Sequence, residues 1–239
     1  MAVKFPGPDD RLYILGRTKQ GKTTAALWHL SGHDFSALPW CIIDTKGDPN
    51  IAWLCDHLPQ IKEISVHDTP GDTGLYHVKP SRDDGYEVDA LLGRIWDKQH
   101  CGVFCDEGYT IIPNHNLIAC LTQGRTREIP MIVLTQRPAW ITKFVESEAD
   151  FVQVFNLSRR DDRKKVADVV HGLNVDYRLD RYCSYWYNVG DDELVQFGPC
   201  PDKSVILQNF RASLPPEDEA NASPIGERQE IKNLGKRVI

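Results

Sequence analysis

The 239-residue sequence lacks any apolar run approaching the roughly 18 residues that a membrane-spanning helix needs. Its first residues, Met1 to Pro6, also lack the apolar stretch of a secretory signal peptide. We therefore expect a protein that neither crosses nor contacts a membrane and that works in the cytoplasm.

Paired cysteines are missing as well. The seven cysteines are an odd number and include no C-x-x-C pair, whereas thiolate zinc sites need ligands at such short spacings. We expect reduced, partly buried thiols and no structural zinc. The sequence also shows no internal repeat or low-complexity tract, which leaves one large α/β domain as the expected organisation.

An excess of positive charge is the third absence. The formal net charge is −6, which argues against a protein that coats nucleic acid over its whole surface. It leaves open a protein that grips DNA through a few basic loops inside an oligomeric ring.

What the sequence does contain is a phosphate-binding motif near its start. Residues 16–24 read GRTKQGKTT and match G-x-x-x-x-G-K-[ST]. An apolar expected strand (11–15) precedes the motif and an expected helix (25–30) follows it, which is the context that the motif requires. Backbone N–H groups and the helix N-terminus would hold the phosphates of ATP. The expected contacts are Gly16, Lys19, Gln20, Gly21, Lys22, Thr23 and Thr24, with Lys22 on the β- and γ-phosphates and Thr23 on Mg²⁺.

A second motif follows an expected strand at 102–105. Asp106 and Glu107 come directly after it, as in a Walker B motif. Asp106 would belong to the Mg²⁺ shell, and Glu107 would act as the general base that polarises the attacking water. An earlier expected strand (39–44) runs into Thr45-Lys46-Gly47-Asp48-Pro49. Its carboxylate and lysine either face the ligand edge of the sheet or form an ordinary polar strand end.

The stretch after these motifs resembles a known family. A helix at 117–123, a Gly124-Arg125 turn, a buried strand at 131–134 and Thr135-Gln136-Arg137-Pro138 are similar to the FtsK/HerA superfamily of DNA-pumping ATPases. The resemblance covers about residues 11–170. It implies that Gln136 is a sensor on a strand between the two Walker strands. It also implies an arginine finger, with Arg125 as the best match and Arg127 as the second choice.

The resemblance implies a RecA-like three-layer α/β sandwich with a mainly parallel central sheet. FtsK proteins carry membrane segments and a winged-helix domain, and HerA proteins an N-terminal β-barrel; neither is evident here. The chain is thus similar to the genome-packaging ATPases of tailless double-stranded DNA viruses. We expect a motor domain over 1–212, followed by a polar linker and tail over 213–239.

Three further segments complete the expectations. The region 68–85 is predicted to be a long loop whose Lys79 and Arg82 contact DNA. Residues 159–165 hold five basic residues and are interpreted as a solvated helix face, with a DNA or subunit contact as the alternative. The aromatic run at 182–189 and the strand at 194–197 predict a hairpin used for sheet packing.

The function expected from these residues is ATP hydrolysis, with ATP and Mg²⁺ as cofactors, coupled to packaging of double-stranded DNA into a preformed capsid. The expected partners are DNA, a homo-oligomeric ring of five or six subunits, and capsid vertex or portal proteins. Its expected place is the host cytoplasm or a virion vertex. Two alternatives stay open, namely a motor of the same superfamily with another cargo, such as DNA transfer or phage extrusion, and a small-molecule kinase.

Overall fold

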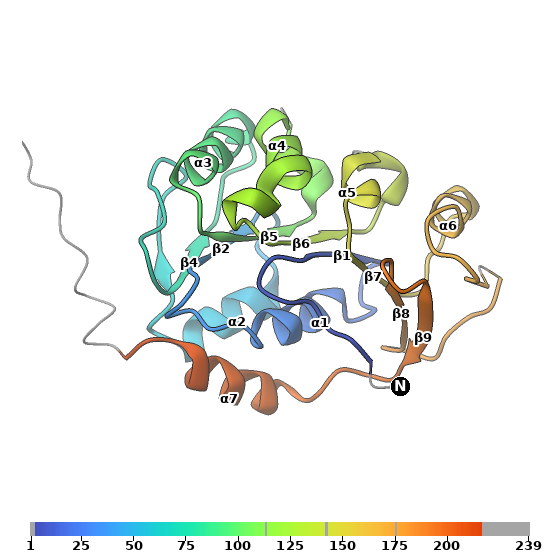
Figure 1. Cartoon of the computed structure of the whole chain (residues 1–239). Coiled ribbons are helices and arrows are strands. Elements are labelled where there is room, and N and C mark those ends of the chain that lie inside the picture. Colours follow the sequence, from blue (N-terminus) through green and yellow to red (C-terminus); the bar gives the residue numbers. More distant parts are fainter. Residues whose placement is uncertain (1–2, 113, 142, 175, 217–239) are drawn as a thin grey trace, which may run out of the picture.

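The computed structural model describes residues 3–112, 114–141, 143–174 and 176–216 of the chain. Its centre is a nine-stranded sheet in the order β3-β4-β2-β5-β6-β1-β7-β8-β9 (Figure 1). All neighbouring strands are parallel except the pairs β7–β8 and β8–β9. The strands are β1 (Arg11–Leu15), β2 (Trp40–Asp44), β3 (Lys62–Glu63), β4 (Leu75–Val78), β5 (Gly102–Asp106), β6 (Met131–Thr135), β7 (Phe151–Val154), β8 (Ser184–Asn188) and β9 (Glu193–Phe197).

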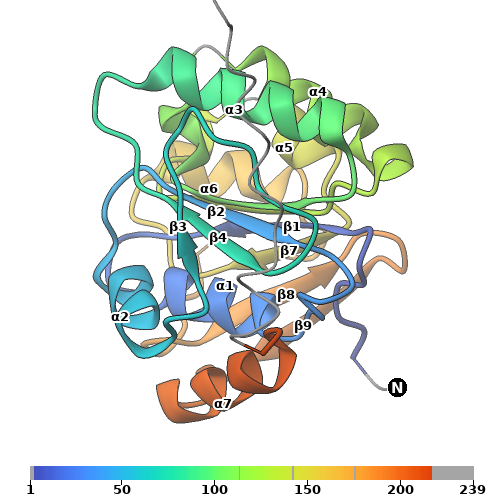
Figure 2. The same cartoon turned by 90° about the vertical axis from the view of Figure 1, so that its left-hand side faces the viewer.

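Helices cover both faces of this sheet. On one face lie α3 (Gly85–Lys98), α4 (His115–Gln123), α5 (Lys143–Ser147) and α6 (Arg160–Ala167). On the other lie α1 (Lys22–Leu30), α2 (Pro49–His57) and α7 (Lys203–Ser213) (Figures 1 and 2). The predicted three-layer, mainly parallel sandwich is confirmed.

The central strands are apolar because both of their faces are buried. In β1, Leu12 and Ile14 join the core beneath α1, whereas Tyr13 and Leu15 join the core beneath α3 and α4. Successive side chains of a strand point to opposite faces, so one five-residue strand contributes to two cores. Each such aliphatic side chain contributes about 1.5–3 kcal/mol when it is fully buried.

The order of the strands determines where the site lies. β6 lies between β1 and β5, and β2 lies on the other side of β5. Because these strands are parallel, their carboxyl ends meet at one edge of the sheet, where ligands bind in open α/β folds. The predicted position of the Gln136 strand between the two Walker strands is confirmed.

The expected loop at 68–85 is wrong in its middle. Residues Leu75–Val78 form β4, with all four side chains buried, and pair in parallel with β2. The strand has only four residues and includes a histidine, so its apolar signal is weak. Lys79 and Arg82 follow it directly and are exposed.

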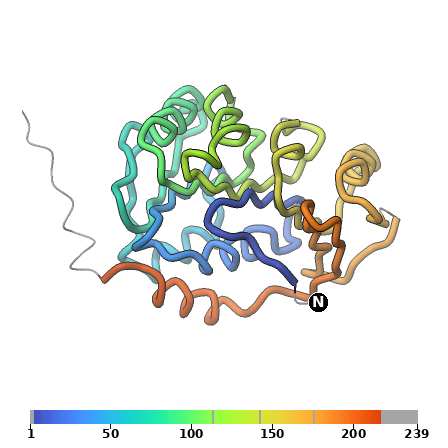
Figure 3. The backbone as a smooth tube through the Cα atoms, in the orientation of Figure 1, coloured from blue at the N-terminus to red at the C-terminus, as the bar shows by residue number. Residues whose placement is uncertain are grey.

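Three helices, namely α2, α5 and α7, were not predicted. α2 begins at Pro49 and is capped by the Asp48 side chain, which accepts from Asn50 N. α7 runs back beneath α1 (Figure 3), where Phe210 stacks on Phe35 at 5.7 Å. It ends at Ser213, one residue past the expected end of the motor domain at 212. Of the expected linker and tail over 213–239, residues 217–239 lie outside the described residues.

The predicted aromatic hairpin is β8–β9. Trp186 on β8 is buried and stacks on Phe151 at 5.3 Å and on Phe197 at 5.4 Å, which agrees with a role in packing.

Among the described helices, none combines the length and the apolar character that crossing a bilayer would take.

We predict that Gly102→Ala destabilises the fold. A Cβ at position 102 would lie 2.3 Å from ring atoms of the fully buried Trp40, and neither can move freely in a packed core. The free energy of unfolding should fall by about 1–3 kcal/mol or more, measured by chemical denaturation. Gly198→Ala is the control because nothing lies within 4 Å of its Cβ position. Equal stability of the two variants would contradict the packing described here.

Candidate active site

The loop of residues 16–21 is fixed by its neighbours on both sides. Gly16 has a φ of 153°, and a Cβ there would lie 2.5 Å from Phe155 Cβ, so only glycine fits. Gly16 N donates to Thr135 O at 3.3 Å, and Arg17 N donates to Asn156 O at 3.0 Å. The Asn156 amide also donates to Gln20 Oε1 at 3.2 Å. The loop is therefore tied to the ends of β6 and β7.

Helix α1 begins at Lys22, directly after Gly21 in the left-handed conformation. Lys22 is buried, and its Nζ donates to Arg17 O at 3.3 Å, across the loop. Burial lowers the pKa of Lys22, and an anionic phosphate would offset that desolvation. Lys19 is exposed on the loop, and Thr24 is half-buried in the first turn of α1. The expected phosphate ligands thus lie on the loop and on the first turn of the helix that follows it.

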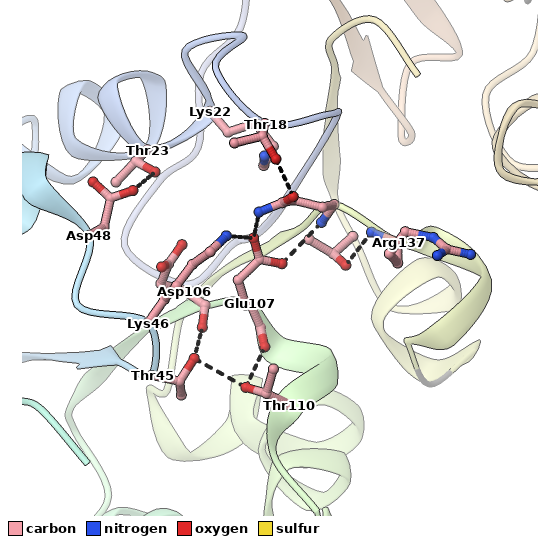
Figure 4. Close-up of polar contacts among 12 residues, drawn as sticks. Thr18, Lys22, Thr23, Thr45, Lys46, Asp48, Asp106, Glu107, Thr110 and Arg137 are labelled. Carbon is pink, nitrogen blue, oxygen red and sulfur yellow. Dashed lines mark hydrogen bonds and ion pairs between the residues drawn. The ribbon is translucent and has the colours of Figure 1, made fainter. Parts of the chain in front are cut away.

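Glu107 follows β5 in a left-handed conformation, with a φ of 55°. This turn leads its buried carboxylate to the ends of the two strands beside β5 (Figure 4). Oε1 accepts from Lys46 Nζ at 2.7 Å and from the Gln136 side-chain amide. Oε2 accepts from Gln136 N at 3.1 Å. The predicted base is held by three donors.

The same network reaches the phosphate-binding loop. The Thr18 hydroxyl donates to Gln136 Oε1, so Gln136 bridges the loop and Glu107. The Thr45 hydroxyl donates to Asp106 O at 2.8 Å (Figure 4). Hydrogen bonds therefore link the phosphate-binding loop with the ends of β2, β5 and β6.

Asp106 is 2% exposed, and its Oδ2 has no hydrogen-bond partner in the described part of the chain. Burial, reinforced by the nearby charge of Glu107, raises the pKa of Asp106 to about 7. The Thr23 hydroxyl donates not to Asp106 but to Asp48 Oδ2, at 3.0 Å. Within the described ranges, no three His, Cys, Asp or Glu side chains group as ligands for a metal ion.

The two candidate fingers lie away from this edge. Arg125 is in the 3-10 turn Gly124–Arg127 that precedes β6, so it lies at the opposite edge of the sheet, where it pairs with Asp150 and is half exposed. The guanidinium carbon of Arg127 lies 4.0 Å from the centre of the Trp96 ring, and its guanidinium donates to Trp96 O at 3.3 Å. Neither arginine can reach the phosphate-binding loop of its own chain.

A third arginine follows Gln136. Arg137 stacks on Trp140 at 3.9 Å, and its Nε lies 3.3 Å from the buried carboxylate of Asp162 on α6. Lys165 donates to Pro138 O at 2.7 Å. The charged helix α6 is therefore only partly a solvated face, because two of its residues anchor the turn after Gln136.

A pocket of about 360 Å³ lies on the β7 side of the phosphate-binding loop. Its lining includes Arg17, Asn156 and Tyr177. A nucleotide held by the loop would have room for its ribose and base on this side.

Sequence reasoning left some partners of the site open and missed another. Lys46 and Asp48 belong to the turn that the sequence left between two interpretations, and both contact residues of the predicted site. His77 on β4 lies 3.6 Å from Asp44 Oδ2 and was hidden in an expected loop. The available signal was the run of charges directly after β2.

Comparisons with known proteins agree with this geometry. No protein-family model matches the sequence. The chain is 37% identical over 222 residues to the DNA packaging ATPase P9 of Enterobacteria phage PRD1, which covers 88% of this chain and 96% of that protein.

Solved structures share the fold. The genome packaging NTPase B204 from Sulfolobus turreted icosahedral virus 2, in complex with AMP, matches with a TM-score of 0.63 and 18% identity over 82% of this chain and 100% of that one. EssC (ATPases 2 and 3) from Geobacillus thermodenitrificans matches with a TM-score of 0.57 and 13% identity over 86% of this chain and 43% of that one.

We predict that the ion pair of His77 and Asp44 makes stability depend on pH. Burial lowers the pKa of His77, but the contacts with Asp44 and Cys55 outweigh this effect and raise it to about 9. A raised pKa stabilises the fold fully below about pH 6.5, the value of an unfolded histidine, and the effect is lost as the pH rises through about 9. The free-energy advantage of the wild type over His77→Gln should thus shrink between pH 6.5 and 9.5 by about 1 kcal/mol or more.

The measurement is chemical denaturation of both proteins across this pH range. Titrating groups that do not contact His77 are common to the two proteins and cancel in the difference. An advantage that stays constant would mean that folding does not raise the pKa of His77.

Proposed function

The chain belongs to the phage DNA packaging ATPases, and from this premise we propose that it hydrolyses ATP at the edge formed by β1, β2, β5 and β6 to drive double-stranded DNA into a preformed capsid. It is an ATPase of viral genome packaging, and the expected likeness to the FtsK/HerA superfamily is confirmed. The small-molecule kinase alternative is not supported.

One observation supports this assignment of the site above the others. The carboxylate of Glu107 and the amide of Gln136 are hydrogen-bonded to each other directly beside the loop that carries Lys22. A base and a γ-phosphate sensor must both lie within reach of the same water for hydrolysis. In this chain two neighbouring strands deliver them to one point.

The donors present fit Mg²⁺, because the ion prefers hydroxyl and carboxylate oxygens and takes its remaining ligands from phosphates and water. The residues that would hold it are Thr23, through its hydroxyl, and Asp106, whose buried Oδ2 has no hydrogen-bond partner among the described residues. Bound Mg²⁺ would neutralise charge on the β- and γ-phosphate oxygens.

In the proposed mechanism, Lys22 binds the β- and γ-phosphates and Gln136 orients the attacking water. Glu107 accepts the proton of that water as the water oxygen attacks the γ-phosphorus. The bond between this phosphorus and the oxygen that bridges the β- and γ-phosphates breaks, and ADP leaves with the electron pair. The buried position of Glu107 excludes bulk solvent and holds its carboxylate in one orientation. Reaction with the bound water is then faster than it would be if the two groups met by random encounter.

We further propose a homo-oligomeric ring of five or six subunits, docked at a capsid vertex or portal in the host cytoplasm. Lys79 and Arg82 are exposed at the nucleotide edge, and the Lys79 side chain packs against Gly47 in the turn that carries Lys46 and Asp48. A DNA phosphate bound by this pair would lie close to the catalytic network. This supports their assignment as DNA contacts.

The function is tested by ATP turnover with and without duplex DNA. We expect DNA to stimulate the assembled protein and the stimulation to weaken as salt rises, since each neutralised phosphate releases counterions. Lys22→Ala should lose ATP binding. Glu107→Gln should bind ATP but turn over about 10²-fold more slowly or worse. Turnover indifferent to DNA, or an active Glu107→Gln protein, would refute the proposal.

We predict that Arg125 acts in a neighbouring subunit. Its half-exposed guanidinium lies on the far edge of its own sheet, and such fingers contribute on the order of 10³-fold to turnover. Arg125→Ala should therefore bind ATP and be nearly inactive. Mixed with Glu107→Gln subunits it should regain activity, because its own intact site borrows the neighbour's arginine.

Arg127→Ala is the matched control, since that arginine packs on Trp96 and the variant should keep most of its turnover. Absence of recovery in mixtures that demonstrably co-assemble would exclude a trans role for Arg125.

A further inference from the structure

Asp48 holds an unusual position for a helix cap. Its Oδ1 accepts from Asn50 N at 2.8 Å, which caps α2. Its Oδ2 points the other way and accepts from the Thr23 hydroxyl of the phosphate-binding loop at 3.0 Å. One carboxylate thus joins the turn after β2 to the first turn of α1 (Figure 4).

The charge around this contact is unbalanced. Two carboxylates at the edge, those of Asp44 and Glu107, have cationic partners in His77 and Lys46. Asp48 and Asp106 form no ion pair within the residues that the structure covers. Buried or crowded carboxylates without a counter-charge are costly unless a cation joins them.

The two unpaired carboxylates also lie near each other. Asp48 N donates to Asp44 Oδ1 at 2.9 Å, and Asp44 on β2 is the register partner of Asp106 on β5. Figure 4 shows both side chains on the side of the site where Thr23 lies. Asp106 Oδ2 is buried and has no partner among the described residues. A hydroxyl and two carboxylates on one side of bound phosphates are donors that suit Mg²⁺.

We propose that Asp48 is the second carboxylate of the magnesium site, acting with Thr23 and Asp106 when ATP is bound. This inference rests on the proposed function, because it requires Mg²⁺ and ATP at the phosphate-binding loop. Asp48 then has two tasks that its two oxygens separate. Oδ1 fixes the turn through the cap of α2, and Oδ2 serves the metal.

Asp48→Asn separates these tasks. Asparagine caps a helix about as well as aspartate does, so α2 and the fold should persist, while the charge that attracts the cation is removed. The matched control is Asp34→Asn. Asp34 also accepts a backbone N–H, from Ser36 at 2.9 Å, but it lies in the connection between α1 and β2, at the opposite edge of the sheet.

The measurement is the affinity for AMPPCP, by calorimetry, once with excess Mg²⁺ and once with EDTA. The ratio of the two affinities measures only how much Mg²⁺ strengthens AMPPCP binding, and the measurement requires no ATP turnover. We expect Mg²⁺ to tighten binding to the wild type and to Asp34→Asn equally. Asp48→Asn should keep the EDTA affinity but lose about 10- to 100-fold of the gain from Mg²⁺, the usual cost of removing a residue that supports a metal.

A full metal-dependent gain in Asp48→Asn would overturn this inference and leave Asp48 as a cap only. If Asp48→Asn does not fold, Asp48→Ser, which also caps, takes its place and the same two outcomes decide. Failure of the wild type itself to bind AMPPCP would instead count against the proposed ATP site.

Discussion

The rest of the site depends on the ion pair and hydrogen bonds that hold the Glu107 carboxylate. A carboxylate that is 2% exposed is costly to bury unless it is paired and hydrogen-bonded. Here Lys46 supplies the charge and Gln136 supplies two donors. Lys46 and Gln136 follow the two strands adjacent to β5. These contacts with Glu107 therefore exist only because β2, β5 and β6 are parallel neighbours whose ends coincide. The left-handed turn at Glu107 completes these contacts by leading the side chain out of the strand register.

Much of this fold could be predicted from the sequence, and the elements that the prediction missed were missed for physical reasons. Strands such as β1 and β6 are continuous apolar runs because helices cover both of their faces. β4 was missed because four residues that include His77 carry too little apolar signal, and its pairing with β2 and β3 makes it a strand. α2 was missed because Pro49 suggested a turn, although proline also suits the first position of a helix that Asp48 caps.

The site, like the fold, was predicted from the sequence only in part. The two motifs predicted the phosphate-binding loop and the carboxylates after β5, because these depend on residues close together in the sequence. The contacts of Lys46 with Glu107 and of Thr23 with Asp48 join residues 61 and 25 positions apart. They follow from which strand lies beside which, and a sequence pattern does not contain that order. The family resemblance placed Gln136 correctly for the same reason, since it carried the strand order with it.

The position of Arg125 constrains any assembly in which it serves a neighbour. The nucleotide edge is formed by the carboxyl ends of the strands, and Arg125 lies at their amino ends beside Asp150. A trans contact must therefore join unlike surfaces of two subunits, and repetition of such a heterologous contact gives a ring when the rotation closes. The arginine would have to leave Asp150, but exposed ion pairs contribute only about 0–1 kcal/mol. Arg127 would have to give up a ring stack and a carbonyl hydrogen bond. Arg125 is the arginine that can be released at the smaller cost.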